Sequence, residues 1–232
     1  MCKKIIGIIG GMGPLATADL FRKIVVNTKA DKDQDHIRIL IDNNTDIPDR
    51  TKAIVASGKS PLPQLIKSAV SLVTMGAEFL IMPCNTAHYF LPEIQKNVEV
   101  PILSMLGVTA EALQRKGIKK VGLLATEGTV SSGIYQQAFR KKEIEILGIS
   151  KEEQSAITDL IYKGVKAGEQ SYNATAARGV MESLLHRGAE ILVLGCTELP
   201  VAVEMYKLNY NVCDPTLELA RAAIIAANGK CI

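Results

Sequence analysis

Two cysteines in equivalent positions of an internal repeat are the residues of this chain best placed to do chemistry. The segment GAEFLIMPCNTA (residues 76–87) returns as GAEILVLGCTEL (residues 188–199), and the two copies align without a gap. Each copy is an apolar run that ends in a cysteine, Cys84 or Cys196, and polar residues follow at once. The repeat therefore predicts a pair of thiols with a shared task.

A pair of thiols can move protons at both faces of one carbon atom. Inverting a stereocentre needs one group that removes a proton and a second group that supplies one from the opposite side. A thiol, whose reference pKa is about 8.5, can serve in either state near neutral pH. Two alternatives stay open: a redox pair, although neither cysteine has a resolving partner nearby in the sequence, and two buried cysteines duplicated without chemistry.

The elements that must position these cysteines are predicted from hydrophobic patterning. Short β-branched runs alternate with amphipathic segments, which is typical of βα units around a mainly parallel sheet. Eight strands are predicted, four in each half, at residues 5–9, 37–41, 78–82, 101–105, 120–124, 143–147, 190–194 and 209–212. Helices are predicted at residues 14–29, 63–75, 107–116, 130–141, 152–167, 172–187 and 215–228.

The repeat extends to the first strand of each half, since KKIIGII (residues 3–9) is matched by KKVGLL (residues 119–124). We predict an α/β fold of two similar halves that face each other. Both cysteines then follow a strand at the carboxyl edge of a parallel sheet, where open α/β sheets bind ligands. Backbone N–H groups at the start of the next helix are expected to lower the thiol pKa.

The segment DIPDRTKAIVASGKSPLP, residues 46–63, carries three prolines. It is predicted to be a long loop with at most a short turn of helix. A loop of this length in a compact fold is often functional.

The composition is that of an ordinary globular protein, with 47% hydrophobic and 22% charged residues and a net charge of +3. No basic run is interleaved with aromatics and no apolar run approaches membrane-spanning length, so we expect neither a nucleic-acid nor a membrane partner, and a cytoplasmic location. The five cysteines lack CxxC spacing, which argues against a disulfide framework or a metal site. Three of them are expected to be buried apolar residues: Cys2, Cys213 and Cys231.

The chain also resembles a known family, the cofactor-independent aspartate racemases of the aspartate/glutamate/hydantoin racemase superfamily. The resemblance rests on five segments in the same order: GIIGGMGP (7–14), IPDRT (47–51), PCNTA (83–87), YKGVKAG (162–168) and GCTE (195–198). It implies two pseudo-symmetric α/β domains, with mainly parallel four-stranded sheets and the active site in the cleft between them. It also implies a homodimer and a C-terminal helix that returns to the first domain, giving domains 1–104 plus 210–232 and 105–209.

The resemblance assigns a role to each matching position. Cys84 and Cys196 match the two catalytic acid/base cysteines. Hydrogen-bonding residues match those that hold the substrate's α-carboxylate and amino group: Asn85, Thr86 and Thr197, which Thr126 is expected to join. Arg50 and Lys166 match the cations that hold the carboxylates, and Met12 and Gly13 are expected to line the substrate cleft through backbone groups. Glutamate racemases carry a His after the second CT and a DSG-like segment near the N-terminus, whereas this chain has Glu198 and GGMGP, so aspartate is the expected substrate.

Four alternatives accompany this prediction. A broad-specificity racemase and a non-catalytic amino-acid-binding protein would use the same scaffold. An NAD-linked oxidoreductase is suggested by GxGxxA at residues 11–16 with Asp42 after it, but NAD does not explain the duplicated cysteine. Lys166 could form a Schiff base with pyridoxal phosphate, but no phosphate-binding signature accompanies it. We therefore expect no cofactor, and we expect His88 to support Cys84 by hydrogen bonding.

Overall fold

The computed structural model describes residues 3–232, so the prediction for Cys2 lies outside the described residues. The chain forms two compact units, each described here by itself. Unit 1 ends its first part at Val108 and resumes over Thr216–Ile232, and unit 2 is Thr109–Pro215. The predicted α/β class with parallel sheets is confirmed, whereas the division into domains 1–104 plus 210–232 and 105–209 stays a prediction.

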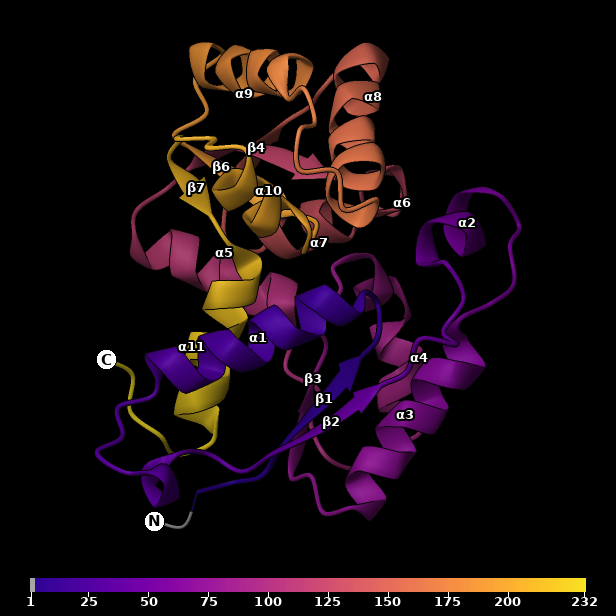
Figure 1. The fold of residues 1–232 in the computed structure, drawn as a ribbon, viewed down its shortest axis with the longest axis vertical. Helices are drawn as coiled ribbons and strands as arrows, with labels where there is room; N and C mark the ends of the chain where they lie inside the picture. The colour runs from indigo at the N-terminus through magenta and orange to yellow at the C-terminus, as the bar shows by residue number, and fades with distance from the viewer. Residues whose placement is uncertain (1–2) are drawn as a thin grey trace. The chain divides into compact units, whose positions relative to one another are not determined.

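Unit 1 is built on a three-stranded parallel sheet in the order β2-β1-β3. Its strands are β1 (Ile6–Gly10), β2 (Ile39–Asn43) and β3 (Phe79–Ile81). The central strand is buried along its whole length, as its apolar sequence IGIIG requires of a strand covered on both faces. Figure 1 shows α1 with α11 on one side of this sheet and α3 on the other. The helices of unit 1 are α1 (Pro14–Asn27), η1 (Asp33–Asp35), α2 (Arg50–Val55), α3 (Leu62–Thr74), η2 (Thr86–Phe90) and α4 (Leu91–Gln95), with α5 (Met105–Arg115) and α11 (Pro215–Ala226) crossing the unit boundaries.

The strand predicted at residues 101–105 is wrong, and unit 1 has three strands where four were expected. The segment makes a single parallel bridge, between Ile102 and Leu80, held by two backbone hydrogen bonds of 2.9 Å. Pro101 has no N–H to extend the ladder backwards, and Met105 already begins α5. The apolar run is therefore too short to pair further.

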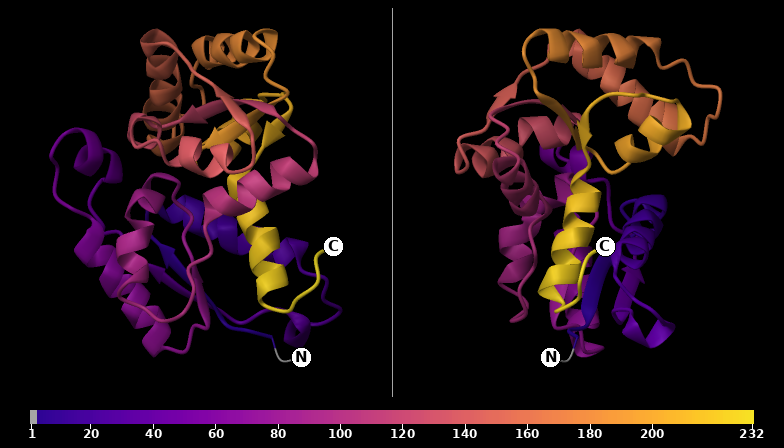
Figure 2. Two further views of the ribbon diagram at one scale, coloured as in Figure 1. Left: turned by 180° about the vertical axis from the view of Figure 1, so that it is seen from behind. Right: turned by 90° about the vertical axis from the view of Figure 1, so that its left-hand side faces the viewer.

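Unit 2 is built on a four-stranded parallel sheet in the order β5-β4-β6-β7. Its strands are β4 (Lys120–Ala125), β5 (Glu145–Leu147), β6 (Ile191–Gly195) and β7 (Val212–Cys213). A core cluster of this unit joins the sheet to α8, η3, α9 and α10, and α8 and α9 lie side by side over one face (Figure 2). The helices of unit 2 are α6 (Glu127–Ser131), α7 (Ile134–Arg140), α8 (Lys151–Asp159), η3 (Leu160–Lys166), α9 (Thr175–His186) and α10 (Leu199–Met205).

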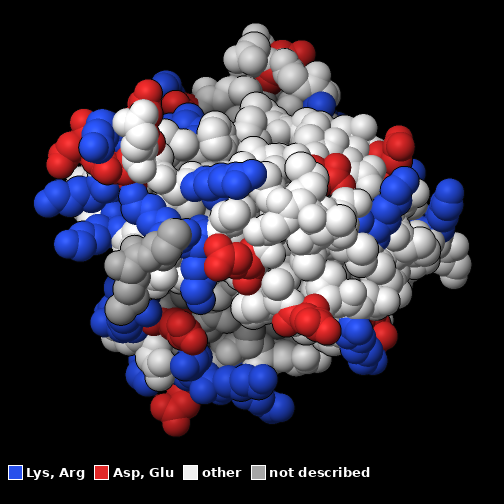
Figure 3. Space-filling view, turned by 90° about the horizontal axis from the view of Figure 1, so that it is seen from below, with Lys and Arg blue, Asp and Glu red and all other residues white. Residues whose placement is uncertain are grey.

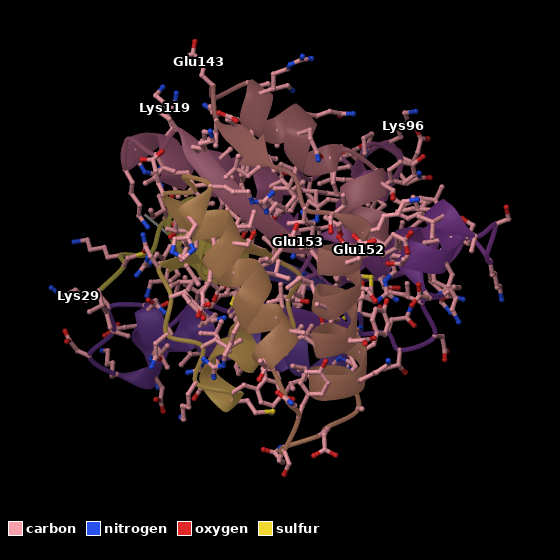
Figure 4. The ribbon with its side chains drawn as sticks, turned by 90° about the horizontal axis from the view of Figure 1, so that it is seen from above. Lys29, Lys96, Lys119, Glu143, Glu152 and Glu153 are labelled. Carbon is pink, nitrogen blue, oxygen red and sulfur yellow. The ribbon has the colours of Figure 1, made fainter. Side chains whose placement is uncertain are left out.

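Two helices predicted in unit 2 are interrupted. The helix expected at residues 130–141 is two, α6 and α7, separated by Gly133 with a φ of 67°. The helix expected at residues 152–167 begins as α8 with a capping box, in which Ser150 and Glu153 exchange side-chain to backbone hydrogen bonds. It then continues as η3, a π-helix of seven residues. Figure 4 labels Glu152 and Glu153 in the first turn of α8.

The repeated GAE triplet makes the same turn in both units. Gly76 and Gly188 follow α3 and α9 with φ of 101° and 95°, a left-handed conformation that suits glycine. The glutamate of each triplet then holds the start of the central strand. Glu78 accepts a hydrogen bond of 2.8 Å from Ile5 N, and Glu190 accepts bonds of 2.8 and 2.7 Å from two backbone N–H groups, those of Lys119 and Lys120.

The charged side chains of the surface are of mixed sign. Positive and negative groups lie interspersed on the face drawn in Figure 3, as a net charge of +3 leads one to expect. Some form exposed ion pairs, such as Lys119 with Glu143 at 3.6 Å, both labelled at the edge of Figure 4. Among residues 3–232, no helix combines the length and the apolar character needed to cross a membrane.

The repeated glycines should be required for backbone conformation alone. A Cβ at Gly76 would meet no atom within 4 Å, so Gly76→Ala tests only the left-handed φ, and we expect the free energy of unfolding to fall by about 1–2 kcal/mol. Gly179→Ala, in the exposed interior of α9 with equally open space, is the matched control and should be neutral or stabilising. Urea unfolding measures both; equal effects in the two variants would contradict this account.

Candidate active site

Cys84 lies in the core of unit 1, beyond the carboxyl end of β3. It is 5% exposed, and the two residues that follow it, Asn85 and Thr86, are buried as well. One apolar cluster contains Cys84 together with Met12, from the loop after β1, and Ile47, from the loop after β2. The structure thus gathers the predicted site residues of the first half at one edge of the sheet.

Arg50 joins this group through the backbone. Its Nη1 donates hydrogen bonds to the carbonyls of Ile47 and Pro48 at 3.3 and 3.1 Å, and its Nη2 donates to Met12 O at 3.2 Å. These contacts fix the guanidinium against the loop after β1. The Met12 carbonyl, expected to line the substrate cleft, therefore accepts a bond from Arg50, and the Gly13 carbonyl accepts one from Thr17 Oγ1 at 3.0 Å.

The glycines of the loop after β1 are required by the packing of the loop itself. A Cβ on Gly10 would lie 2.5 Å from the Thr17 side chain, and a Cβ on Gly11 would lie 2.2 Å from the Asn44 carbonyl oxygen. The N–H of Gly11 donates a hydrogen bond to Thr17 Oγ1 at 3.0 Å. Internal packing therefore accounts for these glycines without a dinucleotide.

His88 supports the cysteine loop, as the sequence predicts. Its Nε2 accepts a hydrogen bond from Met105 N at 3.0 Å, so the ring proton lies on Nδ1, which donates to Cys84 O at 2.8 Å. Burial lowers the pKa of His88 to about 4, although the bond to the Cys84 carbonyl opposes this. The imidazole is thus neutral, and it ties Cys84 to the first residue of α5.

In unit 2 the register of the sheet places Thr126 and Cys196 side by side. Ala125, the last residue of β4, pairs with Gly195, the last residue of β6. Thr126 and Cys196 are the next residues of their chains, and both are buried. Thr126 also begins α6, with its Oγ1 3.1 Å from Thr129 Oγ1.

Glu198 connects the other predicted site residues of unit 2. Its Oε2 accepts hydrogen bonds from Cys196 Sγ at 3.0 Å and from Thr197 Oγ1 at 3.3 Å. Its Oε1 forms an ion pair of 3.0 Å with Lys166 Nζ, which also lies 5.4 Å from the centre of the Tyr162 ring. A cation, a carboxylate and a thiol therefore form a continuous chain of polar contacts.

The expected lowering of the thiol pKa is wrong for Cys196. Burial raises the pKa of Cys196 well above its usual value, and the charge and side-chain hydrogen bond of Glu198 raise it further. The backbone N–H of Glu198 and the charge of Lys166 lower the Cys196 pKa, as the sequence led us to expect of a backbone N–H, but their effect is smaller. The helix that follows, α10, has only seven residues and begins at Leu199. Desolvation and a neighbouring carboxylate outweigh whatever its N-terminus contributes.

The π-helix brings Lys166 to Glu198. Gly164 lies within η3, and a Cβ there would come 3.0 Å from the hydroxyl of Tyr206, whose Oη donates to Glu169 O at 2.7 Å. Burial alone would lower the pKa of Lys166, but the charge of Glu198, together with Cys196 and Tyr162, raises it. Lys166 is therefore a fixed cation. Wide π turns are often found at functional sites.

Comparison with known proteins identifies the family of the chain. The family model described as Asp/Glu/Hydantoin racemase matches residues 9–223. The chain belongs to this family. It is therefore an isomerase, an amino-acid racemase, and the resemblance inferred from the five sequence segments is confirmed.

Three similar proteins span nearly the whole racemase. The aspartate racemase of Picrophilus torridus is 36% identical, with a TM-score of 0.83 over 99% of this chain and 96% of that one. An aspartate racemase homologue from Pyrococcus horikoshii OT3 is 26% identical, with a TM-score of 0.78 over 97% and 99%. The broad specificity amino-acid racemase RacX of Bacillus subtilis (strain 168) is 27% identical over 95% of this chain and 96% of its own.

One described cavity belongs to unit 1. It has a volume of about 470 Å³ and is lined from β2, the loop after it and α3, including Asp42, Asn44 and Lys67. None of the predicted site residues lines it. We therefore assign no catalytic role to this cavity.

Sequence reasoning gave Glu198 no role in the site. Its position two residues after Cys196 was the one indication in the sequence. The structure shows that its carboxylate contacts both the Cys196 thiol and Lys166. Tyr135 of α7 gave no signal at all. Its ring is fully buried, and burial raises its pKa, with Cys213, Asp214 and Cys196 adding to the effect.

The buried His88 should make the racemase less stable in acid. Unfolding restores the His88 pKa from about 4 to its ordinary 6.5, so the unfolded state binds the extra proton first. The contribution of His88 is constant above pH 6.5, and stability falls by about 3 kcal/mol as the pH drops from 6.5 to 4. Urea unfolding across this range should show a weaker pH dependence in His88→Gln than in the parent chain.

His186→Gln, which removes an exposed imidazole from the end of α9, is the matched control. It should leave the pH dependence as it is in the parent chain. A His88→Gln chain with the full acid sensitivity would show that His88 is not the group responsible.

Proposed function

We propose that this racemase interconverts L- and D-aspartate by a two-base mechanism in which Cys84 and Cys196 exchange protons with the substrate. The observation that carries the proposal is the duplicated cysteine. It occurs at the same point of the same repeat, after β3 in unit 1 and after β6 in unit 2, and polar residues follow it in both. A reaction that treats the two faces of one carbon alike explains this duplication.

The proton transfers balance without another reactant. One thiolate takes the α-proton, so that the Cα–H bond breaks and its electron pair stays on Cα as a carbanion. The opposite thiol then protonates the other face of Cα and becomes a thiolate. For the reverse reaction the two sulfurs exchange roles, and hydrogen bonds with nearby cations must stabilise the carbanion.

The remaining residues are proposed to orient the substrate between these sulfurs. Arg50 and Lys166 hold its two carboxylates, for which a guanidinium fork and an ammonium group are suited. The α-carboxylate and the amino group are held by amide and hydroxyl groups, those of Asn85, Thr86, Thr126 and Thr197. Met12 and Gly13 complete the binding site with their backbone.

Aspartate is proposed as the substrate because the similarity to the Picrophilus torridus aspartate racemase is supported by 36% identity over 99% of the chain. The similarity to RacX supports the second candidate, an amino-acid racemase of broad specificity. A homodimer without a cofactor is proposed from the sequence resemblance, and the cytoplasmic location stays a prediction from the sequence. A non-catalytic aspartate-binding protein is the outcome that remains if aspartate binds and no exchange occurs.

Incubation of L-aspartate in deuterated water tests the reaction. With two bases, the D-aspartate formed in the first turnovers should carry deuterium at Cα while the remaining L-aspartate stays protonated, because the two faces meet different thiols. Chiral chromatography with mass spectrometry gives both labels, without added pyridoxal phosphate. Equal labelling of both enantiomers would contradict the two-base mechanism, and the absence of any exchange would exclude the reaction.

Replacement of either cysteine should abolish racemisation. Cys84→Ala and Cys196→Ala each remove one acid/base group, so we expect kcat to fall by roughly a hundredfold to ten-thousandfold in each. Cys231→Ala, near the C-terminus, is the matched control and should keep full activity. A variant of Cys84 or Cys196 that retains activity would remove that residue from the proposed mechanism.

The planar guanidinium of Arg50 is proposed to hold the side-chain carboxylate of aspartate, and Arg50→Gln tests this assignment. Loss of a charge-assisted hydrogen bond should lower kcat/KM for aspartate by roughly tenfold to a hundredfold and leave any activity on asparagine nearly unchanged. The ratio of the two kcat/KM values is the measurement. An equal loss on both substrates would mean that Arg50 acts only by holding the loop that contains Met12.

A further inference from the structure

Glu198 contacts both a cation and a cysteine of the proposed site. Its side chain is 10% exposed, and each carboxylate oxygen has a distinct partner. One oxygen, Oε1, is 3.0 Å from the Lys166 ammonium, and the other, Oε2, accepts from the Cys196 thiol at 3.0 Å. All three residues belong to unit 2, so the network is complete within one unit.

The geometry distinguishes the two protonation states of Cys196. A thiol has one proton to donate, and a carboxylate only accepts, so the contact is a hydrogen bond when Cys196 is protonated. With a thiolate the same contact would place two negative charges 3.0 Å apart in a buried site. Like charges at such a distance disfavour ionisation of one partner.

We propose that Glu198 is a positioning residue that holds Cys196 as a protonated thiol, with Lys166 fixing the carboxylate in place. The inference rests on the proposed function, since it assigns the roles in the resting enzyme: Cys196 is the proton donor, and Cys84 is left as the base. The network also makes the protonation state of Cys196 depend on substrate binding. A substrate carboxylate that draws Lys166 away leaves the charge of Glu198 unbalanced, and Cys196 then holds its proton more firmly.

The other ionisable groups around Cys196 do not supply this effect. Lys166 has the opposite sign and favours the thiolate. Tyr135 is fully buried, and its raised pKa keeps it neutral; Cys213 and Asp214 face Tyr135 from β7 and the residue after it. Glu198 is therefore the neighbour whose charge favours the thiol, and removing that charge should move the titration of Cys196 in one direction only.

The test is residue-resolved alkylation. Iodoacetamide reacts with thiolates, and peptide mass spectrometry gives the rate at Cys196 and at Cys84 separately as a function of pH. In Glu198→Gln the midpoint for Cys196 should fall by roughly one to three pH units, while that for Cys84 stays in place. Lys166→Met should move the Cys196 midpoint the opposite way, upward, which damage to the fold alone would not do.

Glu204→Gln, the same change of charge on an exposed residue of α10, is the matched control and should leave both midpoints unchanged. Glu198→Asp keeps the charge and should stay near the parent midpoint. An unchanged or raised Cys196 midpoint in Glu198→Gln would overturn the inference. The alkylation readout needs no turnover. If Glu198→Gln shows the expected shift but the Cys196→Ala variant still racemises aspartate, the proposed function is overturned and the inference about Glu198 is not.

Discussion

The central strands of the two sheets are buried on both faces, and the rest of the structure depends on this constraint. Apart from Lys120, the first residue of β4, the strands β1, β4 and β6 are apolar and buried, so the proposed catalytic cysteines lie beyond the carboxyl ends of the strands. Parallel pairing brings those ends to one edge of each sheet. Cys84 and Cys196 are the residues that continue the chain from such an edge, and their neighbours in space come from the adjacent strand ends.

The first residues of the repeat have a structural role in both units, whereas the residues after the cysteine differ between the units. Its first three residues build the same support twice, a left-handed glycine, a buried alanine and a glutamate that holds the next strand. Its last residues have diverged. After Cys84 the chain forms a buried 3₁₀ turn braced by His88, whereas after Cys196 a carboxylate turns back to the thiol. Similar supports thus present two sulfurs in unlike electrostatic surroundings.

This difference suits the proposed mechanism, in which the two cysteines act on opposite faces of a substrate that is itself asymmetric. Identical surroundings of the two cysteines could not distinguish an amino group from a carboxylate. Arg50, fixed by backbone carbonyls in unit 1, and Lys166, fixed by Glu198 in unit 2, are cations held in different ways. The ion pair with Lys166 offsets the cost of burying a carboxylate beside a thiol, and it holds the Glu198 side chain in place.

The sequence by itself determined the α/β class, the family and the two cysteines, because hydrophobic period and an ungapped repeat are local properties of the chain. Seven of the eight strands predicted from the sequence correspond to strands of the structure, and the eighth fails because Pro101 limits its pairing to a single bridge. The sequence also predicted Lys166 as a cation of the site and His88 as a hydrogen-bonding support of Cys84. Only the tertiary structure decided that Lys166 meets Glu198 and that Glu198 meets Cys196. Lys166 is the last residue of a π-helix, and the chain after β6 turns the Glu198 carboxylate back to the thiol; no spacing in the sequence encodes either feature.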